Sequence, residues 1–139
     1  MERLKYFFLV TDIGFLLYWT ITFFGWIPEE YLFKDYHNPI LVSWNWSFLP
    51  LDLLVSATGF LSLYFYARKN PLWRSYALIS LVLTFCAGLQ AIAFWTIRLD
   101  FDWSWWLVNL YLLVYPCFFI KSVMVKRTNG MDDASTLKL

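Results

Sequence analysis

The chain has 139 residues, of which 60% are hydrophobic and only 15% are charged, and its net charge is +1 at pH 7. A globule of this length cannot bury so much apolar surface, and a disordered chain would carry far less of it, so the composition excludes a soluble enzyme and a disordered protein. A net charge near zero also gives nucleic acid no electrostatic footprint. We therefore predict a small integral membrane protein that contacts the lipid bilayer and has no nucleic-acid partner.

Four apolar runs are long enough to cross a bilayer as helices. They lie at residues 4–27, 48–67, 76–97 and 105–125. A helix needs about 20 residues to cross a hydrocarbon core of roughly 30 Å, and none of the runs alternates in polarity as a barrel strand does. We predict an all-α, polytopic membrane protein, with an antiparallel four-helix transmembrane bundle over residues 1–127 and a disordered tail at 128–139.

Lysine and arginine lie mostly on one side of these four runs. Nine of them precede or open the first run, join the second to the third, or end or follow the fourth, and only Lys34 and Arg98 lie on the other side. Because basic residues favour the cytoplasmic side, we predict that both termini are cytoplasmic. Tryptophans mark the outer boundary, where aromatic rings favour the membrane interface. They are Trp26, Trp44, Trp46, Trp103, Trp105 and Trp106.

The outer loop at residues 28–47 carries signals of its own. Pro28 and two glutamates after it predict a short interfacial helix, with residues 31–33 lying on the membrane and Asn38-Pro39 stopping it. The sequence Asn45-Trp46-Ser47 matches a glycosylation sequon, and we interpret it as a chance match next to the membrane.

Two later positions predict helix starts. Asn70-Pro71 fits a capping residue followed by a proline in the first turn of the third helix. The fourth helix has two candidate caps, Asp102 and Ser104.

Residues suited to catalysis or metal binding are few. The single histidine, His37, lies in the predicted outer loop, which excludes a histidine-dependent catalytic set inside the membrane. Cys86 and Cys117 lie in different runs without a CxxC pair, and we interpret them as small buried hydrophobic residues. We therefore predict no catalytic residue, no metal and no cofactor, and we favour a protein that is not an enzyme.

Three polar residues are expected at similar depth in the outer half of the membrane. Asp52 lies about one turn inside the second run, Gln90 lies beyond the middle of the third, and Asn109 lies about one turn inside the fourth. A carboxylate at the centre of a bilayer costs roughly 2.5–3.5 kcal/mol, so Asp52 is expected to face the bundle or a wet cavity. The three residues suggest one shared ligand site, with hydrogen bonding between helices as the alternative.

Two further residues complete the candidate ligand-binding set. Asp12 lies well above the inner end of the first run between apolar neighbours, and we expect it to face the bundle interior with a polar partner from another helix. Tyr115 precedes Pro116, which leaves a carbonyl near Leu112 without its helical hydrogen bond, and the tyrosine is a candidate partner there. The alternative for Asp12 is a purely structural hydrogen bond.

The third run also carries small residues at a spacing of four. They are Ser80, Thr84 and Gly88, with Ala87 and Ala91 beside them. Small residues allow helices to approach closely, so this stripe predicts a helix-packing surface.

Two segments resemble the YvaD-like family of small uncharacterised membrane proteins of bacilli. They are residues 7–15, continuing to Trp19, and residues 48–53. The likeness extends over most of the chain. It implies the plasma membrane of a Gram-positive bacterium and brings no activity with it.

The overall plan is similar, more loosely, to the EXPERA sterol-binding and sterol-isomerising proteins. Four spans, cytoplasmic termini, a long first outer loop and an acid early in the second span are shared, and residues 112–116 resemble their proline-kinked last span. Those proteins tend to carry glutamate with glutamine four residues on, whereas this chain has Asp52 and Ser56. The resemblance therefore implies pocket-type binding and not isomerase chemistry.

Three functions remain open from the sequence. The first is a non-catalytic protein that holds an apolar or cationic amphiphile in an outer-half pocket. The second is a structural or accessory subunit that associates with another membrane protein or with a second copy of itself. The third is a small proton-coupled exporter that works as a dimer through Asp12.

Overall fold

The structure is a computed structural model that describes the backbone of residues 1–136 and the side chains of residues 1–125. Its elements are α1 (Glu2–Phe23), the short 3-10 helix η1 (Glu29–Tyr31), α2 (Pro39–Trp46), α3 (Leu49–Ala67), α4 (Trp73–Ile97) and α5 (Trp103–Thr136). No strand occurs within residues 1–136, and the predicted all-α fold is confirmed. The predicted disordered tail at residues 128–139 stays a prediction. The side chains of this segment, and all of residues 137–139, lie outside the described part of the chain.

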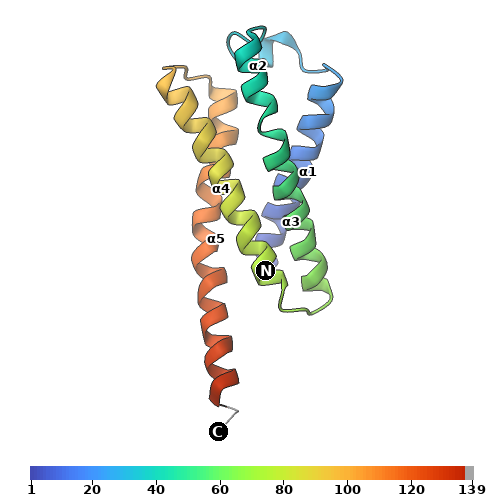
Figure 1. The fold of residues 1–139 in the computed structure, drawn as a ribbon, viewed down its shortest axis with the longest axis vertical. Coiled ribbons are helices and arrows are strands. Elements are labelled where there is room, and N and C mark those ends of the chain that lie inside the picture. Colours follow the sequence, from blue (N-terminus) through green and yellow to red (C-terminus); the bar gives the residue numbers. More distant parts are fainter. Residues whose placement is uncertain (137–139) are drawn as a thin grey trace.

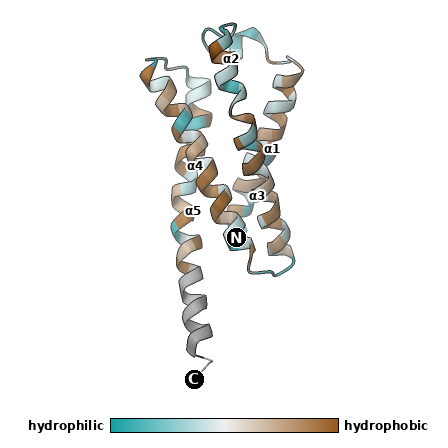
Figure 2. Ribbon diagram, in the orientation of Figure 1, coloured by the Kyte–Doolittle hydropathy of each residue, from teal (hydrophilic) through white to brown (hydrophobic). Residues whose placement is uncertain are grey.

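Four segments are long and apolar enough to cross a membrane. They are Glu2–Phe23, Pro39–Ala67, Trp73–Ile97 and Trp103–Val125, with α2 and α3 together forming the second. Apolar residues, drawn in brown, recur along the helices (Figure 2), and no more than 39% of the most apolar stretch of any segment is buried inside the protein. Such a surface is stable only against hydrocarbon, which confirms a membrane protein with a four-helix bundle.

The helices pack in a row that follows the chain. α1 packs on α3, α3 on α4 and α4 on α5, whereas α1 and α5 have no comparably close backbone contact among the described residues. The start of α1 and the far part of α5 lie at the same end of the bundle (Figure 1). We call this the inner end, after the predicted orientation, and the opposite end the outer end.

Small residues on α4 allow this close packing, as the sequence predicted. Ser80, Thr84, Ala87, Gly88 and Ala91 are all buried. A Cβ atom on Gly88 would lie 2.5 Å from the backbone nitrogen of Leu113, so α4 and α5 meet there with no room for a side chain. Ser80 Oγ also donates a hydrogen bond to the backbone oxygen of Val55 at 3.3 Å, which joins α4 to α3.

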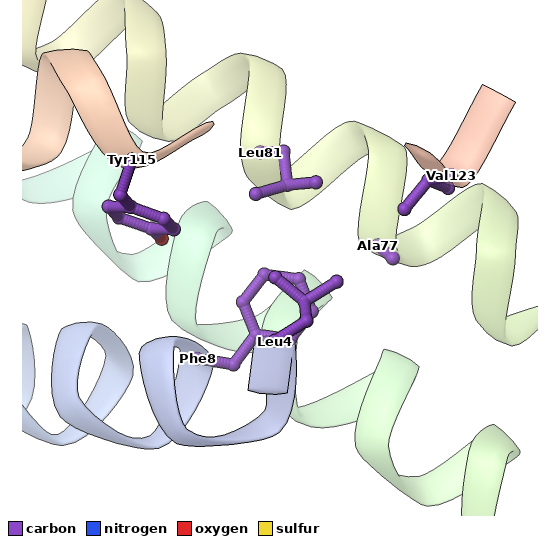
Figure 3. Close-up of a cluster of buried hydrophobic side chains, with 6 residues drawn as sticks. All are labelled: Leu4, Phe8, Ala77, Leu81, Tyr115 and Val123. Carbon is purple, nitrogen blue, oxygen red and sulfur yellow. The ribbon is translucent and has the colours of Figure 1, made fainter. Parts of the chain in front are cut away.

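The tightest part of the core lies toward the inner end. Leu4 and Phe8 of α1 point toward Ala77 and Leu81 of α4 and toward Tyr115 and Val123 of α5 (Figure 3). Every one of these side chains is nearly or fully buried. This cluster joins α1 to α4 and α5 at their inner ends, although the same helices separate farther out.

Two predicted helix starts can be compared with the structure. Asn70 Oδ1 accepts a hydrogen bond from the backbone nitrogen of Leu72 at 2.9 Å, but it does not cap α4. The helix begins at Trp73 with Leu72 as its N-cap, so Asn70 and Pro71 lie in the turn before it and the predicted capping position was wrong. Of the two candidate caps of α5, Asp102 is the one used, since its Oδ1 accepts from the side chain of Ser104 and from two backbone amides. The Ser104 hydroxyl and these amides hold the pKa of Asp102 below its ordinary value.

Two boundary expectations for the outer loop were wrong. Asn38 and Pro39 do not stop a helix but start one, because Asn38 Oδ1 accepts from the backbone nitrogen of Ile40 and Pro39 occupies the first turn of α2. Within the predicted interfacial helix after Pro28, only the three residues of η1 are helical.

The expectation for the two cysteines was also wrong. Cys86 of α4 and Cys117 of α5 are exposed, not buried, because the apolar sequence around them fits lipid as well as a core.

Candidate ligand-binding cavity

A cavity of about 600 Å³ occupies the outer half of the bundle. Residues of α1, α3, α4 and α5 form its walls, and α2 and the outer loop cover its outer end. Aromatic side chains dominate the lining: Phe15, Tyr18, Trp19, Phe33, Trp44, Phe48, Trp95, Trp105 and Tyr111. Its volume lies within the range of about 300–1,000 Å³ that is typical of small-molecule sites.

Phe33 forms the outer wall of this cavity. Its ring centroid lies 5.6 Å from that of Trp95 on α4 and 5.7 Å from that of Trp105 on α5. Asp35, two residues on, accepts a hydrogen bond from Arg98 at 2.8 Å, and this ion pair ties the outer loop to the end of α4. Phe33 was expected to lie on the membrane surface, and instead it is buried beneath the loop.

Asp52 is the acidic residue of the cavity wall. It is 4% exposed and lies in the first turn of α3. The indole nitrogen of Trp19 donates a hydrogen bond to its Oδ2 at 2.9 Å, whereas its Oδ1 is buried and has no hydrogen-bond partner among the described residues. A carboxylate normally accepts several hydrogen bonds, so Asp52 retains capacity to bind a donor or a cation.

A second polar pair lies beside it. The Tyr18 hydroxyl donates to Asn45 Oδ1 at 3.0 Å, and both residues line the cavity. Asn45 is only 7% exposed, which agrees with the interpretation of its sequon as a chance match. The pair joins α1 to α2 and adds an amide and a hydroxyl group to a wall that consists mainly of aromatic side chains.

The structure brings together only part of the predicted polar site. Asn109 lines the same cavity as Asp52, and its Nδ2 donates to the backbone oxygen of Trp105 at 2.8 Å. Gln90 does not join them, because it is exposed on the outside of α4. The depth of Gln90 was derived from the rise per residue, which carries no information about the direction in which the side chain points.

Asp12 lies outside the cavity, in the contact between α1 and α3. It is fully buried, and a Cβ atom on Gly59 would lie 2.0 Å from its Oδ2. The expected interior position was right, but the expected polar partner was wrong, since neither carboxyl oxygen has one among the described residues. The residue opposite is a glycine, which makes room for the carboxyl group and offers no side-chain donor. Ser56 donates instead to the backbone oxygen of Asp12.

Tyr115 also lies just outside the cavity. Its hydroxyl accepts a hydrogen bond from Thr11 at 3.2 Å, and the same threonine lies 3.2 Å from the hydroxyl of Tyr111. Tyr115 therefore links α5 to α1 and does not serve the carbonyl freed by Pro116. Tyr111, one turn farther out on α5, lines the cavity in its place.

The cavity lining carries groups that can contact an organic cation. Within residues 1–125, no group of three or more His, Cys, Asp or Glu side chains could hold a metal ion. The cavity combines one acid with rings of Trp, Tyr and Phe, and such rings attract organic cations through their faces.

Two comparisons place the chain among known sequences. The model of a family described as "Family of unknown function (DUF5360)" matches residues 4–130. The chain belongs to this family. It is also 57% identical over 120 residues to "Uncharacterized protein YvaD" of Bacillus subtilis (strain 168), which covers 86% of this chain and 90% of the relative. No solved structure matches the chain.

The family assignment confirms the YvaD-like resemblance. The matched residues include every side chain of the cavity wall and, apart from residues 2 and 3, all four membrane segments of this DUF5360 chain. The likeness of plan to EXPERA proteins receives no support from these comparisons and stays an expectation.

Several cavity residues of this DUF5360 chain were not found from sequence. Trp44 and Trp105 were interpreted as interface anchors, yet both line the cavity. Trp19 and Tyr18 were not singled out, although one turn of helix separates them from Phe15 on the same wall. The sequence could have indicated Tyr18 and Trp19 as cavity residues. Their rings carry polar groups, and they lie in the outer quarter of α1, at the expected depth of Asp52.

Proposed function

We propose that this protein is a non-catalytic membrane protein that binds a hydrophobic organic cation, or another small cationic amphiphile, in the outer-half cavity. The observation that carries the proposal is Asp52, a buried acid on the wall of a 600 Å³ aromatic cavity with one carboxyl oxygen left without a partner. We further propose that the protein lies in the plasma membrane of a bacterium, with both termini cytoplasmic.

The charge of Asp52 explains why the ligand is a cation. An ionised carboxylate in apolar surroundings is costly unless a positive charge or several donors compensate it. No Lys, Arg or His among the described side chains lines the cavity, and Trp19 supplies a single neutral donor. A ligand with a positive charge near Asp52 supplies that compensation, and the low dielectric strengthens the attraction.

The aromatic wall explains why the cation is organic. A small hydrated metal ion prefers several oxygen ligands, whereas the surfaces here are mainly the faces and edges of Trp, Tyr and Phe rings. Quaternary ammonium groups bind such cages because they are large, weakly hydrated and attracted to the ring faces. Tyr18, Asn45 and Asn109 add polar groups that orient a ligand.

The accessory-subunit alternative loses its main support. That alternative depended on the small-residue stripe of the third span as a surface for another protein. The stripe is instead buried within the chain against α3 and α5. The exporter alternative depended on Asp12, which lies against Gly59 and outside the cavity.

Binding of an ammonium probe tests the proposal. We expect benzyltrimethylammonium to bind the purified protein in nanodiscs by isothermal titration, and Asp52→Asn to weaken binding by about tenfold or more. Asp12→Asn is the matched control, since it makes the same chemical change in a buried acid away from the cavity, and it is expected to leave affinity within about twofold. Absence of binding to the wild type, or equal losses in both variants, would contradict the proposal.

A further inference from the structure

The cavity is bounded on one side by two helices that are not packed together. α1 and α5 contact each other at an outer and an inner level along this part of their length. At the outer level the rings of Tyr18 and Trp105 meet with centroids 5.9 Å apart, and at the inner level Thr11 Oγ1 lies 3.2 Å from the Tyr111 hydroxyl. Beside and between these contacts, the cavity wall includes residues that are also largely exposed on the outside of the protein.

These residues frame a window. Val10 of α1 and Leu107 and Val108 of α5 line the cavity and are 63%, 60% and 58% exposed. Thr11 and Tyr18 are seven residues apart, so the window is about 10 Å tall along α1. It lies near the middle of Glu2–Phe23, a segment that crosses the membrane, and therefore faces lipid chains rather than water.

Gly14 lies in the middle of the window. It lines the cavity, and a Cβ atom added to it would meet nothing within 4 Å. The glycine thus faces open space, in contrast to Gly59 and Gly88, where an added Cβ would collide with a neighbouring helix. No packing contact requires a glycine at position 14, and its missing side chain widens the window.

We infer that the ligand is a membrane-dissolved amphiphile whose hydrocarbon chain passes through the window between α1 and α5 while its cationic head lies near Asp52. This inference rests on the proposed function and adds the class and the source of the ligand. The outer end of the cavity is covered by Phe33, Trp95 and Trp105, whereas the window already adjoins hydrocarbon. A chain that leaves through the window keeps its apolar contacts with lipid and with Val10 and Val108.

Two ammonium probes distinguish a membrane-borne from a water-borne ligand. Dodecyltrimethylammonium carries a chain that needs the window, and benzyltrimethylammonium is a compact cation that fits within the cavity. Gly14→Leu places an apolar side chain in the window without touching Asp52. We expect this variant to weaken dodecyltrimethylammonium binding in nanodiscs by about tenfold or more, and benzyltrimethylammonium binding by less than about twofold.

Two further variants keep the test decisive. Val108→Phe fills the same window from α5 and is expected to reproduce the effect if Gly14→Leu does not fold. Leu17→Phe adds a similar bulk to a lipid-facing position of α1 that does not line the cavity, and is expected to change neither affinity. Equal losses for both probes, or no loss for either in the window variants, would overturn the inference and leave the proposed function standing. Failure of the wild type to bind either probe would overturn both.

Discussion

Two aspartates are buried among the described residues, Asp12 near the middle of α1 and Asp52 at the outer end of α3, but in different surroundings. Asp12 lies in the contact between α1 and α3, where Gly59 leaves room for the carboxyl group and for nothing else. Asp52 lies beside a cavity of about 600 Å³ and is held by one hydrogen bond from Trp19. A buried acid is equally conspicuous in sequence at both positions. The space next to the acid, and not the acid itself, distinguishes a ligand site from an acid that is buried in a contact between two helices.

The inner and outer halves of the bundle also differ in how their helices meet. In the inner half, Phe8, Leu81 and Tyr115 close the bundle across α1, α4 and α5. In the outer half, α1 and α5 separate, and aromatic rings from α2 and the outer loop cover the space between them. Four helices with apolar surfaces can form either arrangement, because lipid is as good a neighbour as another helix. The bulky rings on the outer parts of α1, α4 and α5 favour the open one.

The largest expected effect concerns which half faces the cytoplasm. Reporter fusions within residues 68–72 and after residue 127 are expected to give cytoplasmic signals, and fusions within residues 29–37 an external one. The reason is the excess of Lys and Arg at the inner end. Alkaline phosphatase and green fluorescent protein fusions report the two sides with opposite signals. An external signal from residues 68–72 would reverse the assignment of the two halves.

A double-mutant cycle tests the tight contact between α1 and α3. Gly59→Ala is expected to destabilise the protein by roughly 1–3 kcal/mol, because its Cβ would lie 2.0 Å from Asp12 Oδ2. Asp12→Ala removes the carboxyl group, so the double variant is expected to regain most of that loss. Thermal unfolding in detergent measures all four proteins. Additive effects of the two changes would show that Asp12 and Gly59 do not meet.

An effect of similar size is expected from the single hydrogen-bond donor to Asp52. Trp19→Phe keeps an aromatic ring and removes the hydrogen bond to Asp52, and is expected to cost about 1.5–3 kcal/mol of stability. A bound ammonium ion compensates Asp52 in the variant, so the probe is expected to raise its melting temperature more than that of the wild type. Trp26→Phe is the control, since Trp26 is exposed and lies outside the cavity. Equal ligand-induced shifts in the melting temperatures of wild type and Trp19→Phe would show that Trp19 does not contribute to the site.

The smallest expected effect lies at the cap of α5, at the outer end. Asp102→Ala is expected to cost about 1 kcal/mol, the usual value of an N-cap. The pKa of Asp102 is lowered in the folded protein, so its contribution is present above the ordinary value of 3.8 and is lost as the pH falls through the lowered folded value. In unfolding measured at a series of pH values from 6 downward, the difference between wild type and variant is expected to be full at pH 6 and to shrink as the pH falls below 3.8. A difference that does not change over this range would mean that the charge is not what caps the helix.

Sequence reasoning predicts the helices of this protein well because span length and hydropathy are properties of a single segment. The cap at Asp102 was found for the same reason, since it depends on backbone groups two or three residues away. The small residues of α4 also indicated their own packing, because glycine and serine in a membrane helix favour close approach.

The cavity was less predictable because it depends on how each helix rotates about its axis. A span that is apolar on all sides carries little information about which face turns inward. Gln90 and Asn109 illustrate this, since both were placed at a similar depth and only Asn109 reaches the cavity. The long outer loop was harder still, because Phe33 and Asn45 reach the cavity through contacts between residues far apart in the chain.

Photoaffinity labelling tests the central claim, which is that the outer-half cavity binds an organic cation, most directly. A benzyltrimethylammonium analogue with a diazirine on its ring is bound in nanodiscs, irradiated, and mapped by mass spectrometry. We expect adducts on cavity residues such as Trp19, Trp44 and Trp105, and we expect excess unlabelled benzyltrimethylammonium to suppress them. Adducts confined to lipid-facing residues such as Leu17 and Val114, without competition, would contradict the account.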